Sequence, residues 1–133
     1  VADTLSLPYV YVRSTPKDHG LENLIEGSLM PGTRVVVIED LISTGGSSLK
    51  AVEALRAAGC EVVGMAALFT YGFPVAEKAF EKANVKLITL SNYNAMLEAA
   101  LATNYIQESD LATLREWRKD PASWVPNPQS LTD

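Results

Sequence analysis

The chain has 133 residues, 47% hydrophobic and 20% charged, a composition typical of a globular domain that excludes disordered, collagen-like and coiled-coil chains. Sixteen acidic residues against eleven basic ones leave a formal net charge of −5, which argues against a nucleic-acid-binding protein that relies on a basic face. No apolar run approaches the roughly 20 residues of a membrane span, so we expect no membrane association.

The N-terminal part contains one short predicted strand and a long irregular stretch. Residues 8–12 are rich in β-branched and aromatic side chains, which predicts a strand. Residues 13–30 show no clean period, and a connection of that length within a compact domain is usually a lid or a binding loop. Within this stretch, we expect residues 24–27 to pair as an edge strand.

The remainder alternates between predicted strands and helices. Apolar runs predict strands at 34–38, 61–69 and 85–90. The first of these is continuous, as is typical of a strand buried on both faces of a parallel sheet. Helical spacing predicts four helices: one directly after the glycine loop at 43–47 with Gly59 at its C-terminal end, where a left-handed residue is favoured, one that begins at Pro74, one capped by Asn92, and one that ends near Pro121.

This alternation predicts an α/β fold, with a parallel sheet covered by helices on both faces. We expect residues 1–133 to form a single core domain that ends in an irregular tail at 122–133. The one cysteine, Cys60, cannot form an internal disulfide, which fits a reducing cytoplasm. With a single histidine, the chain also does not suit a His/Cys zinc site.

Residues 35–48 carry the most informative pattern, because an apolar strand ends in two carboxylates, a glycine loop follows, and a helix begins. A helix N-terminus offers unpaired N–H groups and the positive end of the helix dipole, so a phosphate fits there. Hydroxyls of Ser43, Thr44, Ser47 and Ser48 add donors. The loop matches neither a Walker A sequence nor the G-x-G-x-x-G dinucleotide pattern.

The acidic pair Glu39 and Asp40 lies at the carboxyl end of this strand, where open α/β sheets bind ligands. Adjacent strand residues leave on opposite faces unless the loop turns them. Carboxylates would repel a phosphate unless they bind sugar hydroxyls or a metal ion. A ribose 5-phosphate meets this condition, with its phosphate on the loop and its diol on the acids. The alternative is that both acids are solvated and cap the helix.

Residues 38–47 (IEDLISTGGS) resemble the phosphoribosyl-diphosphate (PRPP) signature of the type I phosphoribosyltransferases. Residues 13–20 (RSTPKDHG) resemble the catalytic loop of the orotate phosphoribosyltransferases within that family, at matching spacing from the acidic pair. The resemblance continues through FTYGF at 69–73 and LREWRKDP at 114–121. It implies a partial, Rossmann-like type I phosphoribosyltransferase core, whose N-terminal hood and pyrophosphate-binding loop would precede this chain.

The resemblance also implies a role for each matching residue. Arg13, Lys17 and His19 would contact the diphosphate, and their loop would complete the neighbouring site of a homodimer. Ser43 would also contact orotate. The implied catalytic residues are Lys17, His19 and Asp40, and the implied PRPP-binding residues are Arg13, Lys17, His19, Glu39, Asp40, Leu41, Ile42, Ser43, Thr44, Gly45, Gly46 and Ser47. Within the latter set, Glu39 and Asp40 would hold the ribose hydroxyls and residues 43–47 the 5-phosphate.

The implied reaction transfers the ribose 5-phosphate of PRPP to orotate and gives orotidine 5′-phosphate and pyrophosphate, a step of pyrimidine (UMP) synthesis. The implied cofactor is Mg²⁺, held mainly through PRPP rather than by ligands from the chain. Ser14 departs from the family pattern because a lysine commonly stands there, and Tyr71 because some members carry an arginine that reads the orotate carboxylate. The alternatives are a purine phosphoribosyltransferase, a non-catalytic PRPP-binding regulator and a purely structural fragment.

Overall fold

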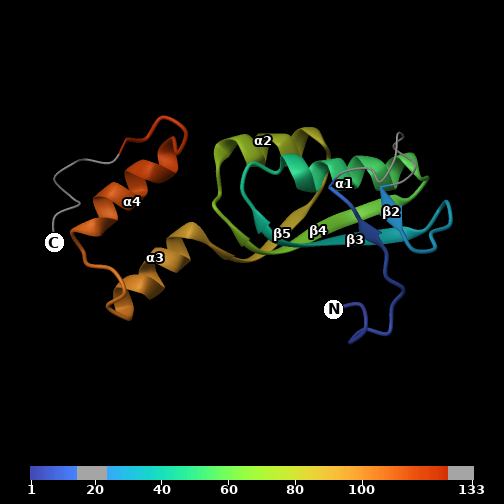
Figure 1. Cartoon of the computed structure of the whole chain (residues 1–133), viewed down its shortest axis with the longest axis horizontal. Helices are drawn as coiled ribbons and strands as arrows, with labels where there is room; N and C mark the ends of the chain where they lie inside the picture. The colour runs from blue at the N-terminus through green and yellow to red at the C-terminus, as the bar shows by residue number, and fades with distance from the viewer. Residues whose placement is uncertain (15–23, 126–133) are drawn as a thin grey trace. The chain divides into compact units, whose positions relative to one another are not determined.

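The computed structural model describes residues 1–14 and 24–125, and the chain divides into two compact units between Leu90 and Ser91. The described elements, in chain order, are β1 (Tyr11–Val12), β2 (Ile25–Glu26), β3 (Arg34–Ile42), α1 (Gly46–Ala57), β4 (Glu61–Thr70), α2 (Pro74–Lys82), β5 (Leu87–Asn92), α3 (Tyr93–Ala102) and α4 (Asp110–Lys119) (Figure 1). The alternation of strands and helices confirms the predicted α/β class.

The sheet of the first unit has the strand order β3-β4-β5. Strands β3 and β4 run parallel, with Arg34 opposite Glu61 and Ile42 opposite Thr70. Each connection between neighbouring strands is a helix, and right-handed crossovers that step in the same direction place their helices on the same face. Figure 1 shows α1 and α2 together on one side of the three strands. The carboxyl ends of β3 and β4 therefore lie side by side at one edge.

The core of the first unit lies between this sheet and the two helices. The apolar stripe of α1 points into it, with Val52 fully buried and Leu55 3% exposed. The cluster of buried side chains draws on β3, α1, β4, α2 and the segment before β5, and comprises Ile42, Val52, Met65, Ala67, Ala76, Phe80 and Val85. Both helices contribute to the same cluster, so one continuous apolar core fixes the position of the loop that joins β3 to α1.

The opposite face of the sheet carries exposed apolar side chains. The prediction that the strand at 34–38 is buried on both faces is wrong here, because Val36 is 56% exposed and Ile38 51%. Side chains alternate between the two faces of a strand, and α1 and α2 cover the face of Val37 alone. Leu68 of β4 and Ile88 of β5 are likewise more than half exposed. The sheet thus presents an apolar outer face.

Several local predictions are confirmed. Within the segment 24–27, Ile25 and Glu26 form the strand β2, which pairs antiparallel with β1. Gly59 has a φ of +82°, the left-handed conformation expected after the last turn of α1. Pro74 stands in the first turn of α2, and the Asn92 side chain accepts a hydrogen bond of 3.1 Å from the Ala95 amide and caps α3.

The second unit is built on a contact between its two helices. The Tyr93 hydroxyl of α3 donates a 3.0 Å hydrogen bond to the Leu114 carbonyl of α4. The Tyr93 ring also lies 5.6 Å from the Trp117 ring, centroid to centroid, so Trp117 contributes to the packing of the two helices. Helix α4 ends at Lys119, shortly before Pro121. In the part of the chain that the structure describes, no helix combines the length and the apolar character that crossing a bilayer requires.

Candidate functional site

The two predicted carboxylates lie on β3, close to its carboxyl end. Glu39 pairs with Ala67 of β4, which is buried in the core, so Glu39 is half-buried on the helix-covered side. Asp40 is exposed, and its Oδ1 accepts a 2.7 Å hydrogen bond from the Leu41 amide. The acids therefore leave the strand on opposite faces, as the alternation of strand side chains predicts.

Strand β3 extends four residues beyond its predicted end at Ile38 and reaches Ile42. The alternation of exposure breaks where Asp40 and Leu41 are both exposed, and Ile42 is then fully buried in the core. The strand continues because β4 supplies a partner up to Thr70. Ile42 thus anchors the start of the glycine loop beneath the surface, while the acids before it stay near solvent.

Helix α1 begins at Gly46, two residues earlier than predicted, so the glycine pair forms the helix start itself. Gly45 is the N-cap residue with a φ of +81°, and no side chain caps this helix. The first helical hydrogen bond runs from the Leu49 amide to the Gly45 carbonyl at 2.9 Å. The amides of residues 46–48 therefore point out of the helix end, where an anion could accept from them.

The absence of a side-chain cap on α1 also excludes one alternative for the acidic pair. The N-cap residue is Gly45, which has no side chain, and no hydrogen bond joins Glu39 or Asp40 to the first amides of α1. The carboxylate of Asp40 instead bonds the amide next to it on the strand. The alternative that both acids cap the helix is therefore wrong.

Three of the four hydroxyl groups that were predicted to add donors at this helix start are accessible, and the fourth is not. Thr44 and Ser47 are exposed and Ser43 is half-buried, so all three remain candidates as donors to a bound anion. Ser48 is only 2% exposed, and its hydroxyl is buried rather than available to a ligand. Ser48 faces inward because it lies on the side of α1 that carries Val52 and Leu55, three to four residues apart as helical periodicity requires.

The end of β4 lies directly beside this loop. The Tyr71 amide donates a 3.1 Å hydrogen bond to the Ile42 carbonyl, and the Gly72 amide donates to the Thr70 hydroxyl at 3.0 Å. The Tyr71 ring stacks on the Phe73 ring at 5.3 Å between centroids, and meets the Phe69 ring edge-on at 5.4 Å. Phe73 is buried and Tyr71 half-buried, so the rings form part of the packing at the end of β4.

Arg13 does not belong to the three-stranded sheet; it directly follows β1 in the separate β1–β2 ribbon. Its amide donates a 2.7 Å hydrogen bond to the Leu24 carbonyl, and its guanidinium forms an ion pair with Glu26 of β2. Glu26 could not be identified from the sequence, because its pairing with Arg13 depends on the register of β1 and β2. The predicted residues Lys17 and His19 lie outside the described residues.

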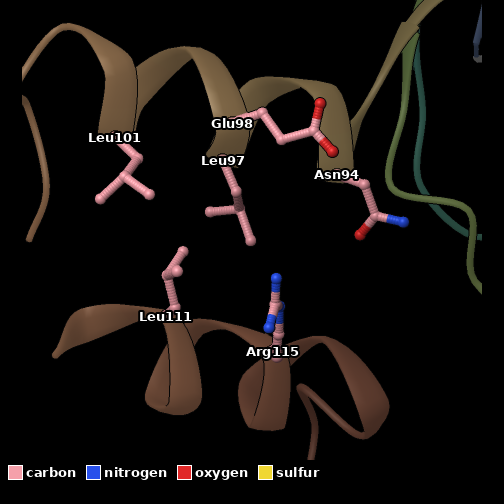
Figure 2. Close-up of a pocket in the computed structure, with 6 residues that line it drawn as sticks. All are labelled: Asn94, Leu97, Glu98, Leu101, Leu111 and Arg115. Atoms are coloured by element: carbon pink, nitrogen blue, oxygen red, sulfur yellow. The ribbon is translucent and has the colours of Figure 1, made fainter. Parts of the chain in front are cut away.

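The second unit contains a pocket of about 360 Å³ between α3 and α4. Figure 2 shows Leu97 and Leu101 of α3 pointing toward Leu111 of α4, with Arg115 extending into the same space toward Asn94. Glu98 completes the lining. The pocket contains none of the residues predicted from the sequence, which concentrate instead at the β3–α1 junction and the β1–β2 ribbon.

At the β3–α1 junction, open amides and hydroxyls can bind an anionic group while adjacent carboxylates accept hydrogen bonds from hydroxyls. In the described ranges, no three His, Cys, Asp or Glu side chains gather into a group able to hold a metal ion. The junction thus offers donors for an anionic group and carboxylate acceptors for hydroxyl groups.

Comparison with known proteins agrees with this chemistry. Residues 1–102 match the family model described as phosphoribosyl transferase domain. The orotate phosphoribosyltransferase of Bacteroides fragilis is 73% identical over 124 residues, which cover 93% of this chain. The chain spans 58% of the length of that relative.

Solved structures show the same similarity. The UMP synthase of Leishmania donovani matches 88% of this chain and 25% of its own, with a TM-score of 0.71 and 28% sequence identity. The orotate phosphoribosyltransferase of Aeropyrum pernix matches 80% of this chain and 57% of its own, with a TM-score of 0.67 and 32% identity.

Proposed function

The chain belongs to the phosphoribosyl transferase family, and from this premise we propose that the whole protein is an orotate phosphoribosyltransferase. It would transfer the ribose 5-phosphate of PRPP to orotate and release pyrophosphate, as a step of pyrimidine synthesis. The similarity to the B. fragilis enzyme supports the choice of orotate as the acceptor base. The observation that carries the proposal is the helix start at Gly46, whose amides have no side-chain cap and which follows the acidic end of β3 after a short loop.

The 5-phosphate would bind at the start of α1. The amides of residues 46–48 supply donors, the helix dipole favours the negative charge, and the hydroxyls of Thr44 and Ser47 extend the donor set. The main chain can approach the phosphate closely because Gly46 carries no side chain. Leu41 and Ile42 belong to the same segment, Ile42 as its buried anchor.

The acidic pair would bind the ribose hydroxyls. Asp40 is exposed and its carboxylate is oriented by the Leu41 amide, so its second oxygen is available to a hydroxyl donor. Glu39 is half-buried on the other face of the strand and would reach the sugar from the side of α1 and α2. Ser43, half-buried between the acids and the glycine pair, would contact orotate as well as the phosphate.

The chemical step breaks the C1–O bond between ribose and diphosphate and forms a bond from C1 to an orotate nitrogen. Positive charge develops on the ribose ring while negative charge grows on the departing pyrophosphate. The protein would therefore act mainly through electrostatic stabilisation, with Arg13, Lys17 and His19 on the diphosphate. Lys17 or His19 could also deliver a proton to the leaving group. Binding at both ends of PRPP would hold C1 at the orotate ring.

The residues of this site fit a Mg²⁺ ion that binds together with PRPP rather than by itself. Mg²⁺ is typically bound by one or two carboxylates together with substrate phosphates. Glu39 and Asp40 offer carboxylate oxygens of this kind, and the described residues contain no larger group of metal ligands. When bound with PRPP, the ion would supply charge neutralisation on the diphosphate.

The remaining features of the proposal concern the protein as a whole. It would act as a homodimer in which the Arg13–His19 loop of one subunit completes the site of the other. It would act in the cytoplasm, which agrees with a buried free thiol at Cys60. The net charge of −5 does not favour nucleic acid as a partner.

The test is an assay of the whole protein with PRPP, Mg²⁺ and one base at a time. We expect orotate to be consumed and pyrophosphate to be released only when PRPP is present. Adenine, guanine and hypoxanthine should not react. Turnover of a purine instead of orotate would make the protein a purine phosphoribosyltransferase. Binding of PRPP with no base converted would make it a regulator that shares the fold.

A further inference from the structure

Glu26 contacts the side chain of Arg13 across the β1–β2 ribbon. The Nε of Arg13 donates to Oε1 of Glu26, and Nη2 contacts the same oxygen. The register explains the contact, because Tyr11 lies opposite Glu26 and Val12 opposite Ile25. Arg13 is therefore the diagonal neighbour of Glu26 on one face of the ribbon, a separation that long side chains bridge.

The Arg13 main chain is fixed as well. Its amide donates to the Leu24 carbonyl at 2.7 Å and so extends the ladder one residue beyond the Val12–Ile25 pair. The Arg13 side chain is 32% exposed and that of Glu26 is 49% exposed. An arginine at such a position would otherwise sample many rotamers. Here both its backbone and its guanidinium are restrained before any ligand arrives.

The contact leaves Arg13 able to bind an anion at the same time. A guanidinium has five N–H groups, and Nε and Nη2 use one each toward Glu26. Three N–H groups remain for oxygens of a diphosphate, two of them side by side on the edge formed by Nη1 and Nη2. Glu26 thus holds one edge of the guanidinium without blocking the other.

We propose that Glu26 is a positioning residue that orients Arg13 for the diphosphate of PRPP. This inference rests on the proposed function and adds a residue to it that lies outside the IEDLISTGGS segment and the RSTPKDHG segment. Restraining a rotamer-rich side chain before binding removes part of the entropy cost of binding, so its loss weakens binding by about 3- to 10-fold. Glu26 acts through Arg13, so the effect disappears when Arg13 is absent.

The experiment is a double-mutant cycle in the whole protein, with Glu26→Gln, Arg13→Ala and the double variant. Steady-state kinetics give KM for PRPP and for orotate, and calorimetry gives the Kd of PRPP. Glu26→Gln is expected to raise both PRPP constants about 3- to 10-fold and to leave KM for orotate within twofold. In the Arg13→Ala background the same substitution is expected to change the PRPP constants less than twofold.

Glu61→Gln is the matched control, since Glu61 also forms an exposed ion pair, with Arg34 at 3.7 Å, at the amino-terminal ends of β3 and β4. It is expected to leave all constants unchanged. A lower KM for PRPP in Glu26→Gln would mean that Glu26 competes with the diphosphate, and equal effects with and without Arg13 would mean a merely structural role; either result overturns the inference. A protein that binds PRPP with this coupling but converts no orotate would refute the proposed function and leave the inference standing.

Discussion

Gly45 lies against the ring of Phe80, so close that a Cβ on Gly45 would stand 2.8 Å from a ring carbon. Gly45 also has a φ of +81°, which a residue with a side chain rarely adopts. Phe80 belongs to α2 and is 4% exposed, so its ring is packed in the core and cannot easily move away from an added side chain. The backbone of the glycine loop is therefore fixed by α2 as well as by its own strand and helix.

Gly45→Ala should destabilise the protein by about 2 kcal/mol or more, because a methyl group must push into a packed ring from an unfavourable backbone conformation. Urea unfolding followed by circular dichroism measures this change. PRPP binding should fall as well, since the loop must move to relieve the clash.

Gly46→Ala provides the contrast, because a Cβ there meets nothing nearer than the Thr44 hydroxyl at 3.9 Å. Its stability should remain the same or rise by up to about 1 kcal/mol, since alanine is the better helix former. Its affinity for PRPP should nevertheless fall about tenfold or more, the scale of one lost hydrogen bond to a charged group. Equal stability losses in the two variants, or wild-type PRPP affinity in Gly46→Ala, would contradict the assignment.

Asp40→Asn should reduce kcat/KM for PRPP by about 10- to 100-fold, because a hydrogen bond from a sugar hydroxyl to a carboxylate contributes about 1.5–3 kcal/mol. The fold should be unaffected, since Asp40 is exposed and an asparagine oxygen can still accept from the Leu41 amide. Initial-rate kinetics together with the unfolding midpoint separate the two effects.

Glu53→Gln is a suitable control for Asp40→Asn, because Glu53 is an exposed carboxylate on α1 and lies outside the predicted site. It should leave kcat/KM within twofold of wild type. If Asp40→Asn behaves like this control, the carboxylate does not bind the ribose.

Much of the fold follows from local sequence signals. Asn92 caps α3, Pro74 opens α2 and Gly59 adopts the left-handed conformation, as each residue type indicates. These predictions hold because each depends on the backbone of a few neighbouring residues. The acidic pair and the glycine loop were also predicted at the end of a strand, and they lie there, at the junction of β3 and α1.

The features that could not be predicted from the sequence depend on contacts between segments that are distant in the chain. Strand β3 runs on to Ile42 because β4 offers a partner, although two acids suggested an earlier end. Ser48 is buried by the orientation of α1, while its neighbour Ser47 remains exposed. The pairing of Arg13 with Glu26 depends on the register of a ribbon whose strands are far apart in the chain.

The exposed outer face of the sheet predicts that the 133-residue chain, expressed by itself, associates with itself. Val36, Ile38, Leu68, Ile88 and Leu90 are each more than half exposed on this face. Contiguous apolar surface of this kind promotes association. The chain should therefore sediment as a dimer or larger species at micromolar concentration in analytical ultracentrifugation.

Ile38→Thr together with Leu68→Ser should shift this chain toward the monomer. Val75→Thr is the control, because Val75 is 56% exposed on α2, away from the sheet face, and should leave the association unchanged. A wild-type chain that sediments as a single monomeric species at the same concentration would show that the outer face does not drive association.

Lys17→Ala tests the proposed electrostatic contribution to the chemical step. If the Lys17 ammonium meets the diphosphate, it stabilises negative charge that grows as the C1–O bond breaks, and its removal should lower kcat by roughly 10²–10³-fold in the whole protein. Lys78→Ala removes the same charge from an exposed position on α2 and should leave kcat within twofold, which separates a local effect from a change in net charge. Ser14→Ala, at the position where the family commonly has lysine, should also be mild. Single-turnover measurements with PRPP and orotate report the chemical step directly, and equal rates for Lys17→Ala and Lys78→Ala would show that the Lys17 charge takes no part in it.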